Sequence, residues 1–415
     1  MLNSTARIWI ISELYYPEQT STGYFLTKIA EGLARTMPVN VICGQPTYSE
    51  HGLRAASFEE HNYVRIHRVR ATHFRKDKLF LRAINLVTLS VSVAYFALTR
   101  FRQGDRLLIV TNPPTLPPIV GLIARLRGVV DTHLLVHDVY PEVLAATGFL
   151  RVDSIAYQAL QRVFSATFHL YNSIIVLGRD MEAVIRVKLN GAQKTVTVIP
   201  NWGDVDEVVP LPRCANTFLA NNNLKAPYII QFSGNIGLTH DIDTILAAAE
   251  RLRERRDILF VFVGFGGKVG AIAEAISIGD LHNVRLFLRQ PRDMLGPMLA
   301  SATATVISFV GSMKGLSVPS RMYNVLSAGT PIIAIADADS ELALVVVEEN
   351  AGWVLEPGDV DGLAKLIERL ASPDGAAEAL SKGTNGRTAV TSRYTYELAL
   401  DRFHEVVAQG LAAAS

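Results

Sequence analysis

The stretch VPSRMYNVLSAGTPI (residues 318–332) places a proline, a hydroxyl and a guanidinium directly before an apolar, helix-like run. Ser320 can cap the free backbone N–H groups of a first helical turn, and Pro319 fixes the approach of the chain. A helix start of this kind also binds anions, and Arg321 adds a positive charge to it. Gly329 supplies the left-handed residue at which helices commonly end. The stretch therefore predicts a helix whose first turn faces an anionic group.

Two acids and a histidine stand at the predicted end of a strand in HLLVHDVYPEVLAATG (residues 133–148). A single histidine at this place would more often be structural, but His137, Asp138 and Glu142 occur together. Because ligands bind at the carboxyl ends of parallel strands, this combination indicates residues that line a cleft.

A polar loop, PEQTSTGYF (residues 17–25), follows the first predicted strand, and Gly23 opens a helix within it. Loops after parallel strands gather at one edge of the sheet. We therefore expect Ser21, Thr22 and Gly23, together with Glu142, to contact an acceptor substrate.

A glycine-rich stretch, FSGNIGLTHD (residues 232–241), joins the end of a predicted strand to a helix that begins near Asp241. Gly234 lets the main chain come close to a ligand, and Asn235 and His240 can point donors at it. A glycine-rich turn with a capping aspartate explains the same spacing, so both interpretations stay open.

A second glycine-rich stretch, FVGFGGKVG (residues 262–270), invites comparison with the dinucleotide-binding fingerprint. Gly264 and Gly266 fit its start, but Val269 stands where the last glycine belongs. Arg289 lies in the region where the fingerprint has an acidic residue at a strand end. We therefore reject an NAD site and expect a turn near a nucleotide.

The bulk properties bound the function classes. A chain of 415 residues with 49% hydrophobic residues is long enough for two cores. Forty basic and 39 acidic residues give a formal charge of +1, which argues against a nucleic-acid partner. Cys43 and Cys214 lack a disulfide or zinc pattern, and the first apolar run is too short for a signal sequence. We expect a cytoplasmic protein without a structural metal.

Short β-branched runs alternate with helix-period segments along the whole chain, as in parallel sheets covered by helices. The strand candidates in the first part of the chain are RIWIIS, VNVIC, VRIHRV, RLLIV, THLLVH, SIIVL and VTVIP. Those in the second part are YIIQFSG, ILFVFVG, VRLFL, ATVISF, PIIAIA and GWVLE. The alternation is interrupted by a stretch rich in Pro, Asn and Asp, where we place a domain boundary. The expected organisation is a first domain at 1–200, a linker at 201–227, a second domain at 228–393 and a last helix at 394–415 that packs at the domain junction.

The segment LFLRAINLVTLSVSVAYFAL (residues 79–98) is mostly apolar. A membrane span needs about 20 apolar residues, and polar side chains interrupt this run, so we do not expect it to span. Two interpretations stay open: a helix packed within the first domain, or a helix at the bilayer surface with basic flanks near anionic headgroups. The interruptions are Arg82, Asn85, Thr88, Ser90 and Ser92, and the flanking cations are Arg75, Lys76, Lys78, Arg100 and Arg102.

Six motifs carry a resemblance to a known family. In chain order they are TNPPTLPPIVGLIARLRG, HDVYPEVLAATG, VIPNWGD, FSGNIGLTHDIDTILAAAERL, VPSRMYNVLSAGTPI and DSELALVVVEENAGWVLEPGD. On these motifs the chain resembles the retaining glycosyltransferases of family 4, and among them the bacterial surface-polysaccharide branch that includes colanic-acid enzymes. The resemblance covers nearly the whole chain. It implies the GT-B fold, an α/β architecture of two Rossmann-like, doubly wound domains facing each other across a cleft.

The resemblance implies that the second domain holds a nucleotide-diphosphate sugar and the first an acceptor. The donor-binding residues would be Gly234, Asn235, His240, Gly264, Gly266, Arg289, Ser320, Asn324, Ser340 and Glu341. The acceptor-binding residues would be Ser21, Thr22, Gly23 and Glu142, and the catalytic residues His137, Asp138 and Arg321.

The chain departs from the wider family at four of its positions. Leu316 and Asn324 stand where the family carries two glutamates, and Asn235 and His240 stand where Arg and Lys are common. Arg321 would therefore carry most of the positive charge that meets the diphosphate.

The function implied is transfer of a hexose-type unit to a lipid-linked saccharide with retention of configuration. The leaving phosphate would accept the proton of the acceptor, so no dedicated protein base would be required. We expect neither a metal nor another cofactor, because Arg321 and backbone N–H groups would neutralise the diphosphate. The protein would be cytoplasmic, with peripheral contact at the inner face of the cytoplasmic membrane. Two other functions share the architecture: a sugar-nucleotide epimerase, and a non-catalytic sugar-nucleotide sensor if Leu316 and Asn324 mark lost activity.

Overall fold

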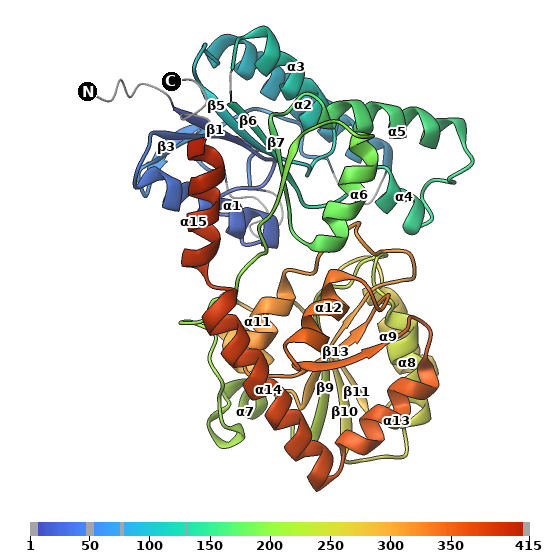
Figure 1. Cartoon of the computed structure of the whole chain (residues 1–415). Helices are drawn as coiled ribbons and strands as arrows, with labels where there is room; N and C mark the ends of the chain where they lie inside the picture. The colour runs from blue at the N-terminus through green and yellow to red at the C-terminus, as the bar shows by residue number, and fades with distance from the viewer. Residues whose placement is uncertain (1–6, 47–53, 75–78, 130, 410–415) are drawn as a thin grey trace. The chain divides into compact units, whose positions relative to one another are not determined.

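The computed structural model describes residues 7–46, 54–74, 79–129 and 131–409 (Figure 1). The chain divides into two compact units. The first comprises Met1–Val143, Leu150–Pro200 and Ala399–Ser415, and the second comprises Leu144–Phe149 and Asn201–Leu398. The domain limits expected from the sequence stay predictions, and each unit is described by itself.

The first unit is built on a sheet with the strand order β3-β4-β2-β1-β5-β6-β7-β8. Its central strands are fully buried, as expected for a parallel sheet covered by helices on both faces. The strands are β1 (Ile8–Ile11), β2 (Val39–Cys43), β3 (Phe58–His61), β4 (Val64–Arg68), β5 (Arg106–Val110), β6 (Asp131–Val136), β7 (Ser173–Val176) and β8 (Thr195–Val198).

Seven of these strands follow the runs predicted from the sequence, and β3 does not. β3 pairs with β4 antiparallel at the edge of the sheet, and its sequence FEEH is exposed or half-buried throughout. With a single apolar residue it lacks the apolar pattern by which a strand is recognised. The helices of this unit are α1 (Ser21–Ala34), α2 (Leu79–Arg100), α3 (Leu116–Leu126), α5 (Ile155–Phe168) and α6 (Arg179–Leu189). Helix α4 (Glu142–Ala146) begins in this unit and belongs to the second from Leu144 onward.

The second unit has an all-parallel sheet with the order β11-β10-β9-β12-β13-β14. All six strands were predicted: β9 (Tyr228–Asn235), β10 (Ile258–Phe265), β11 (Val284–Phe287), β12 (Ala304–Ser308), β13 (Ile332–Ile335) and β14 (Gly352–Leu355). Its helices are α7 (Thr217–Asn221), α8 (Ile242–Arg251), α9 (Val269–Ile278), α10 (Leu295–Leu299), α11 (Arg321–Ser327), α12 (Glu341–Glu348), α13 (Val360–Leu370) and α14 (Pro373–Arg393).

Each sheet has a point at which the chain changes direction across the strand order, and ligands of doubly wound sheets bind there. In the first sheet β1 lies between β2 and β5, and in the second β9 lies between β10 and β12. The loops after β1, β5, β9 and β12 are therefore the places at which the two units can hold substrates.

The last helix, α15 (Tyr396–Gln409), begins in the second unit and belongs to the first from Ala399 onward. Within the first unit, Arg106 Nη1 donates a hydrogen bond to the carbonyl of Val407 at 2.8 Å. The expected packing of this helix at the domain junction stays a prediction.

The apolar segment predicted at residues 79–98 is helix α2, which continues to Arg100. Within the described residues α2 is the one helix long and apolar enough to cross a membrane. Its inner face, with Leu89, Val93 and Ala97, is buried in the first unit. The hydroxyl of Ser92 in α2 donates a hydrogen bond to the backbone carbonyl of Arg70, which lies before the helix. These contacts confirm a helix packed on the first unit. The predicted basic flank of Arg75, Lys76 and Lys78 lies outside the described residues.

Candidate active site

The guanidinium of Arg321 lies at the switch point of the second sheet. Its Nη1 donates a hydrogen bond to the carbonyl of Ser233 in β9 at 2.7 Å. Its Nη2 lies 3.0 Å from both ring nitrogens of His240, and its Cζ lies 4.5 Å from the ring centroid of Phe232. The fold thus brings the start of α11 against the end of β9. The first turn of α11 is the place for which the sequence predicted an anionic ligand.

The ring of His240 packs against this guanidinium. Its Nδ1 donates a 2.7 Å hydrogen bond to the carbonyl of Ser308 at the end of β12, and its ring stacks on Phe309 with centroids 5.4 Å apart. Burial, and then the charge of Arg321, hold the pKa of His240 well below its usual range, so the ring is neutral. The sequence led us to expect that His240 points a donor at the ligand. The structure instead uses that N–H internally and places the ring against Arg321.

No described residue supplies a carboxylate partner for Arg321, whose polar contacts are the Ser233 carbonyl and the His240 ring. Arg321 as a whole residue is half-buried. Burial of most of the guanidinium lowers the pKa of Arg321 to about 10, which keeps it charged at neutral pH. A largely buried cation without a counter-charge is costly. The site therefore favours an anionic ligand.

The glycines around Arg321 are required by close approaches of the main chain. Gly234 has φ +118°, and a Cβ there would lie 3.1 Å from Nη1 of Arg321. Gly264 and Gly266, at the end of β10, also have positive φ. A Cβ on Gly264 would lie 1.9 Å from the carbonyl oxygen of Gly234, and a Cβ on Gly266 would lie 2.4 Å from the carbonyl oxygen of Ile236. The glycine-rich spacing in the sequence is thus explained by two strand ends packed against each other beside a guanidinium.

An exposed aromatic ring lies beside these glycines. Phe265, the last residue of β10, is 41% exposed, and the guanidinium of Arg289 lies 5.7 Å from its ring centroid. Asn235, the last residue of β9, is exposed at the neighbouring register position. The pair of Phe265 and Arg289 offers a flat surface on which a base can stack.

Other predicted donor residues have structural contacts. Ser320 is the N-cap residue of α11, as predicted, but its backbone is already helical (φ −57°, ψ −26°) and its side chain makes no capping hydrogen bond; the predicted capping bond is therefore wrong. Ser340 caps α12 by accepting from the N–H of Ala343 at 3.4 Å, and Glu341 is buried in the first turn of that helix. The side-chain oxygen of Asn324 accepts the backbone N–H of Asp204 at 2.8 Å. Their direct roles in donor binding stay predictions.

In the first unit, the structure brings together residues from the ends of three neighbouring strands. The hydroxyl oxygen of Thr111, which follows β5, accepts the backbone N–H groups of His137 at 3.0 Å and Asp138 at 3.3 Å. The hydroxyl oxygen of Thr22 in α1 lies 3.4 Å from Nδ1 of His137. Two predicted residues, Thr22 and His137, are therefore in contact. Thr111 was not singled out, although it opens the TNPP motif directly after a strand.

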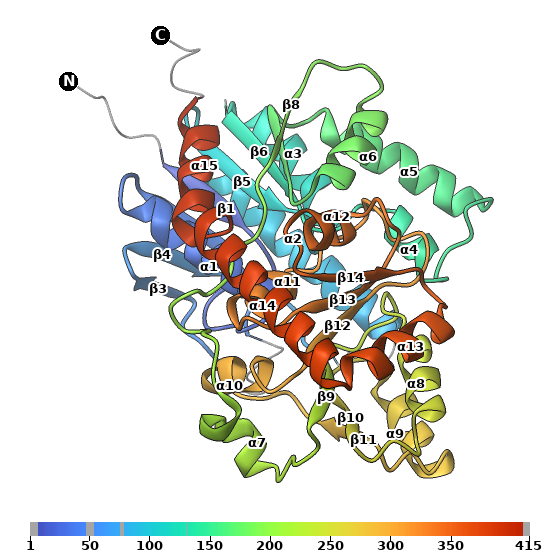
Figure 2. The same ribbon diagram turned by 60° about the horizontal axis from the view of Figure 1, so that its bottom comes forward.

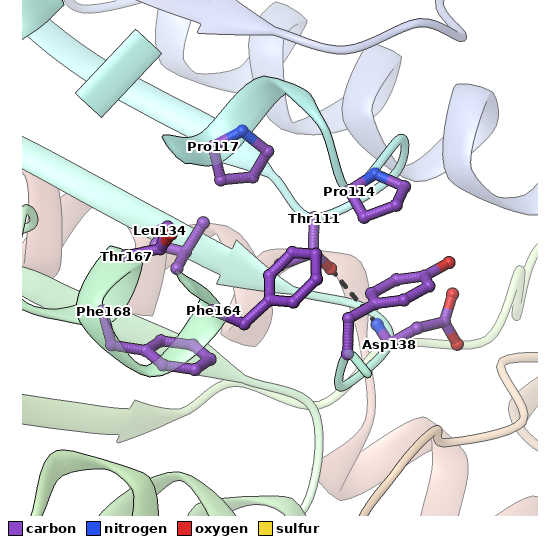
Figure 3. A pocket seen from close by; sticks show the side chains of 9 residues that line it. Thr111, Pro114, Pro117, Leu134, Asp138, Phe164, Thr167 and Phe168 are labelled. Atoms are coloured by element: carbon purple, nitrogen blue, oxygen red, sulfur yellow. Dashed lines mark hydrogen bonds between the residues drawn. The ribbon is translucent and has the colours of Figure 1, made fainter. Parts of the chain in front are cut away.

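Burial lowers the pKa of His137 to about 4, so its imidazole is neutral at pH 7. A small, mostly apolar pocket lies beside the neighbouring Asp138 (Figure 3). Asp138 lies at one end of it and Phe168 at the other. The pocket is lined by Thr111, Pro114, Pro117, Leu134, Asp138, Tyr140, Phe164, Thr167 and Phe168.

The remaining acceptor candidates have partners within the unit. Oε1 of Glu142 forms an ion pair with Nζ of Lys188 at 2.6 Å, and the Lys188 side chain is 5% exposed. Sequence reasoning missed Lys188, because nothing in its helical context marks a buried lysine. Helix α1 begins at Ser21, capped by Thr20, and Gly23 packs closely on Glu18, where a Cβ would lie 2.9 Å from the carbonyl oxygen.

Comparison with known proteins identifies relatives over most of the chain. The sequence is 30% identical over 398 residues to the probable glycosyltransferase WbjE of Pseudomonas aeruginosa, covering 96% of each chain. It is 25% identical over 375 residues to the putative colanic acid biosynthesis glycosyl transferase WcaI of Escherichia coli (strain K12), covering 86% of this chain and 89% of that one. Residues 216–387 match the family of glycosyl transferases group 1. The chain belongs to this glycosyltransferase family.

Solved structures of low sequence identity share its fold. Sucrose-phosphate synthase from Thermosynechococcus elongatus superimposes with a TM-score of 0.77 at 19% identity, covering 99% of this chain and 100% of that one. HepE from Anabaena, solved in complex with UDP and glucose, gives a TM-score of 0.73 at 13% identity, covering 97% and 100%. The expected α/β GT-B fold and the expected glycosyltransferase class are confirmed for this protein.

Proposed function

We propose that this glycosyltransferase moves a hexose-type unit from a nucleotide-diphosphate sugar to a lipid-linked saccharide in the biosynthesis of a surface polysaccharide, with retention of configuration. The relatives WbjE and WcaI support the class of reaction, and the name of WcaI supports a polysaccharide product. The complex of HepE with UDP and glucose supports a nucleotide-sugar donor.

The observation that carries the proposal is the uncompensated guanidinium of Arg321. A guanidinium about 4 Å from a phosphate interacts by roughly 4 kcal/mol at an effective dielectric near 20. Breaking the glycosidic bond adds negative charge to the diphosphate, so part of this attraction grows in the transition state and accelerates the reaction. Arg321 then binds the donor and also stabilises the leaving group.

In the first unit, we assign His137 and Asp138 to the positioning of the sugar and the acceptor. A neutral His137 can donate a hydrogen bond to a sugar hydroxyl or accept one from it without adding charge. The leaving phosphate takes the proton of the acceptor hydroxyl as the new bond forms on the same face of the sugar. We propose that this needs no metal, because Arg321 and backbone N–H groups neutralise the diphosphate. The enzyme would act in the cytoplasm at the inner face of the membrane.

The experiment that tests this proposal is product analysis with a panel of UDP-, GDP- and dTDP-sugars, with and without a lipid-linked acceptor fraction. Sugar incorporated into lipid, with release of one nucleoside diphosphate, is the expected result. A new sugar nucleotide formed without any acceptor would establish an epimerase instead. Binding of a sugar nucleotide, seen as a thermal shift, without turnover under any condition would establish a sensor.

A further inference from the structure

Helix α2 has an apolar face that no other element covers among the residues that the structure describes. Its inner side is buried, but a stripe at spacings of three, four and seven residues points away from the first unit, and each member is between 44% and 74% exposed. Large apolar side chains gathered in this way on a surface mark an interaction site. The stripe consists of Phe80, Val87, Val91, Tyr95 and Leu98.

The neighbouring helices extend this face. Helix α2 packs beside α3, and α3 beside α5, so the three form a row on one side of the first sheet (Figures 1 and 2). On α3, Leu122 and Leu126 are 54% and 78% exposed, one helical turn apart. On α5, Ile155 and Val163 are 87% and 49% exposed. We call this row of α2, α3 and α5 the three-helix face.

The charge on the three-helix face has one sign. None of the three helices contains an aspartate or a glutamate, although the whole chain has 39 acids against 40 bases. Arg82, Arg125 and Arg162 lie on the three helices and are exposed. An exposed apolar surface with arginines and no acids complements a layer that is apolar within and anionic at its surface.

We infer that the three-helix face docks on an anionic lipid bilayer. A second copy of the chain is the other candidate occupant, but a two-fold interface places the same patch against itself, so arginines would face arginines with no acid to pair with them. A lipid surface supplies both the hydrocarbon for the stripe and the phosphates for the arginines. The inference deepens the proposed function, on which it rests for the identity of the acceptor: a lipid-linked saccharide lies in the same surface.

Hydrogen bonds between α2 and the rest of the first unit limit how far the protein enters the bilayer. Two of the polar residues that interrupt α2 bond back to the first unit: Ser90 to Thr115 at 2.8 Å, and Asn85 to the backbone of Phe74 at 2.9 and 3.0 Å. Since these bonds hold the inner face of α2 on the protein, only the outer stripe is available to lipid. Helix α2 therefore lies along the surface and does not cross the membrane.

The test is flotation of the full chain with vesicles of phosphatidylcholine alone or mixed with phosphatidylglycerol. We expect flotation with the mixed vesicles, reduced by salt. Val91→Asp and Tyr95→Asp should each weaken binding at least about tenfold, because a side chain leaves the hydrocarbon. Arg125→Glu and Arg162→Glu should each weaken it about fivefold or more.

The control for general stickiness is Ile278→Asp, which alters a side chain that is 77% exposed on α9 of the second unit and should leave flotation unchanged. Absence of flotation, equal binding to both kinds of vesicle, or equal loss in the control would overturn the inference. So would a dimer in light scattering that Val91→Asp dissolves, since the face would then belong to a second copy. The nucleotide-induced thermal shift is measured without lipid, so failure of the donor proposal is detected separately.

Discussion

Replacing Arg321 by methionine separates the cost of this residue to stability from its contribution to function. Methionine keeps much of the length of the side chain and its contact with the ring of Phe232, over which the guanidinium now lies at 4.5 Å. It removes the charge and the hydrogen bond to the Ser233 carbonyl. The variant therefore tests whether the guanidinium is present for an anion or for the fold.

The two effects have different magnitudes. Desolvation of a buried ion costs several kcal/mol, and here no described carboxylate repays it, while a hydrogen bond from a charged group returns about 1.5–3 kcal/mol. Without ligand, the free energy of unfolding of Arg321→Met should therefore stay within about 1 kcal/mol of the wild type or rise. Loss of roughly 4 kcal/mol of attraction to a diphosphate corresponds to a weakening of donor binding by roughly 10²–10³-fold. Turnover should fall by about 10²-fold or more.

The assay is denaturant unfolding of the free protein, followed by calorimetric titration with UDP, GDP and dTDP. Arg255→Met is the matched control, because Arg255 is a surface arginine of the same unit whose Nη2 pairs with Asp257 at 2.8 Å, and such pairs contribute little. Unchanged nucleotide affinity in Arg321→Met would refute the assignment of the diphosphate to this corner. A loss of several kcal/mol of stability in the free variant would show that the guanidinium serves the fold.

Three other perturbations test separate parts of the site. Gly234→Ala should weaken donor binding at least about tenfold in the same titration, because φ +118° is strained for alanine and its methyl group would press on the guanidinium; normal affinity would contradict the packing argument. Glu142→Gln should lower the free energy of unfolding by about 2 kcal/mol, since Lys188 loses its buried partner, and adding Lys188→Met should restore part of it. The pKa of His137 is about 4 in the folded protein and 6.5 in the unfolded chain. The unfolded state therefore binds the proton more readily, and the free energy of unfolding falls as the pH drops from 6.5 to 4. His137→Gln should remove about 1–2 kcal/mol of this fall, and an unchanged dependence of stability on pH would refute burial of the ring.

Helix α2 was predicted either to pack within the first domain or to lie at the bilayer surface, and both predictions can hold for different faces of the same helix. The packed interpretation is confirmed by Leu89, Val93 and Ala97 on the buried side. The lipid-facing interpretation stays a prediction, but it now concerns a defined stripe that includes Val91 and Tyr95. Periodicity identifies an apolar face without telling whether protein or lipid covers it, because both environments favour the same side chains.

The sequence by itself determined the order of the strands along the chain, the α/β class and the family, since these depend on local apolar runs and on short motifs in a fixed order. It also located the corner at Arg321, because proline, serine, arginine and the closing glycine are neighbours in the chain. It could not determine that the edge strand β3 exists, because a half-exposed strand carries little apolar pattern. It also predicted a capping hydrogen bond from the Ser320 side chain, which the structure does not contain although Ser320 is the N-cap residue of α11.

Only the tertiary structure decided what surrounds each candidate side chain. Arg321 meets Ser233 and His240 from 88 and 81 residues away, and Thr111 meets His137 from 26 residues away. Such contacts arise because neighbouring parallel strands, distant in sequence, end at the same edge of a sheet. Burial and the absence of a described counter-charge, which make Arg321 a candidate anion site, are properties of that assembly and leave no mark on the residues next to Arg321 in the chain.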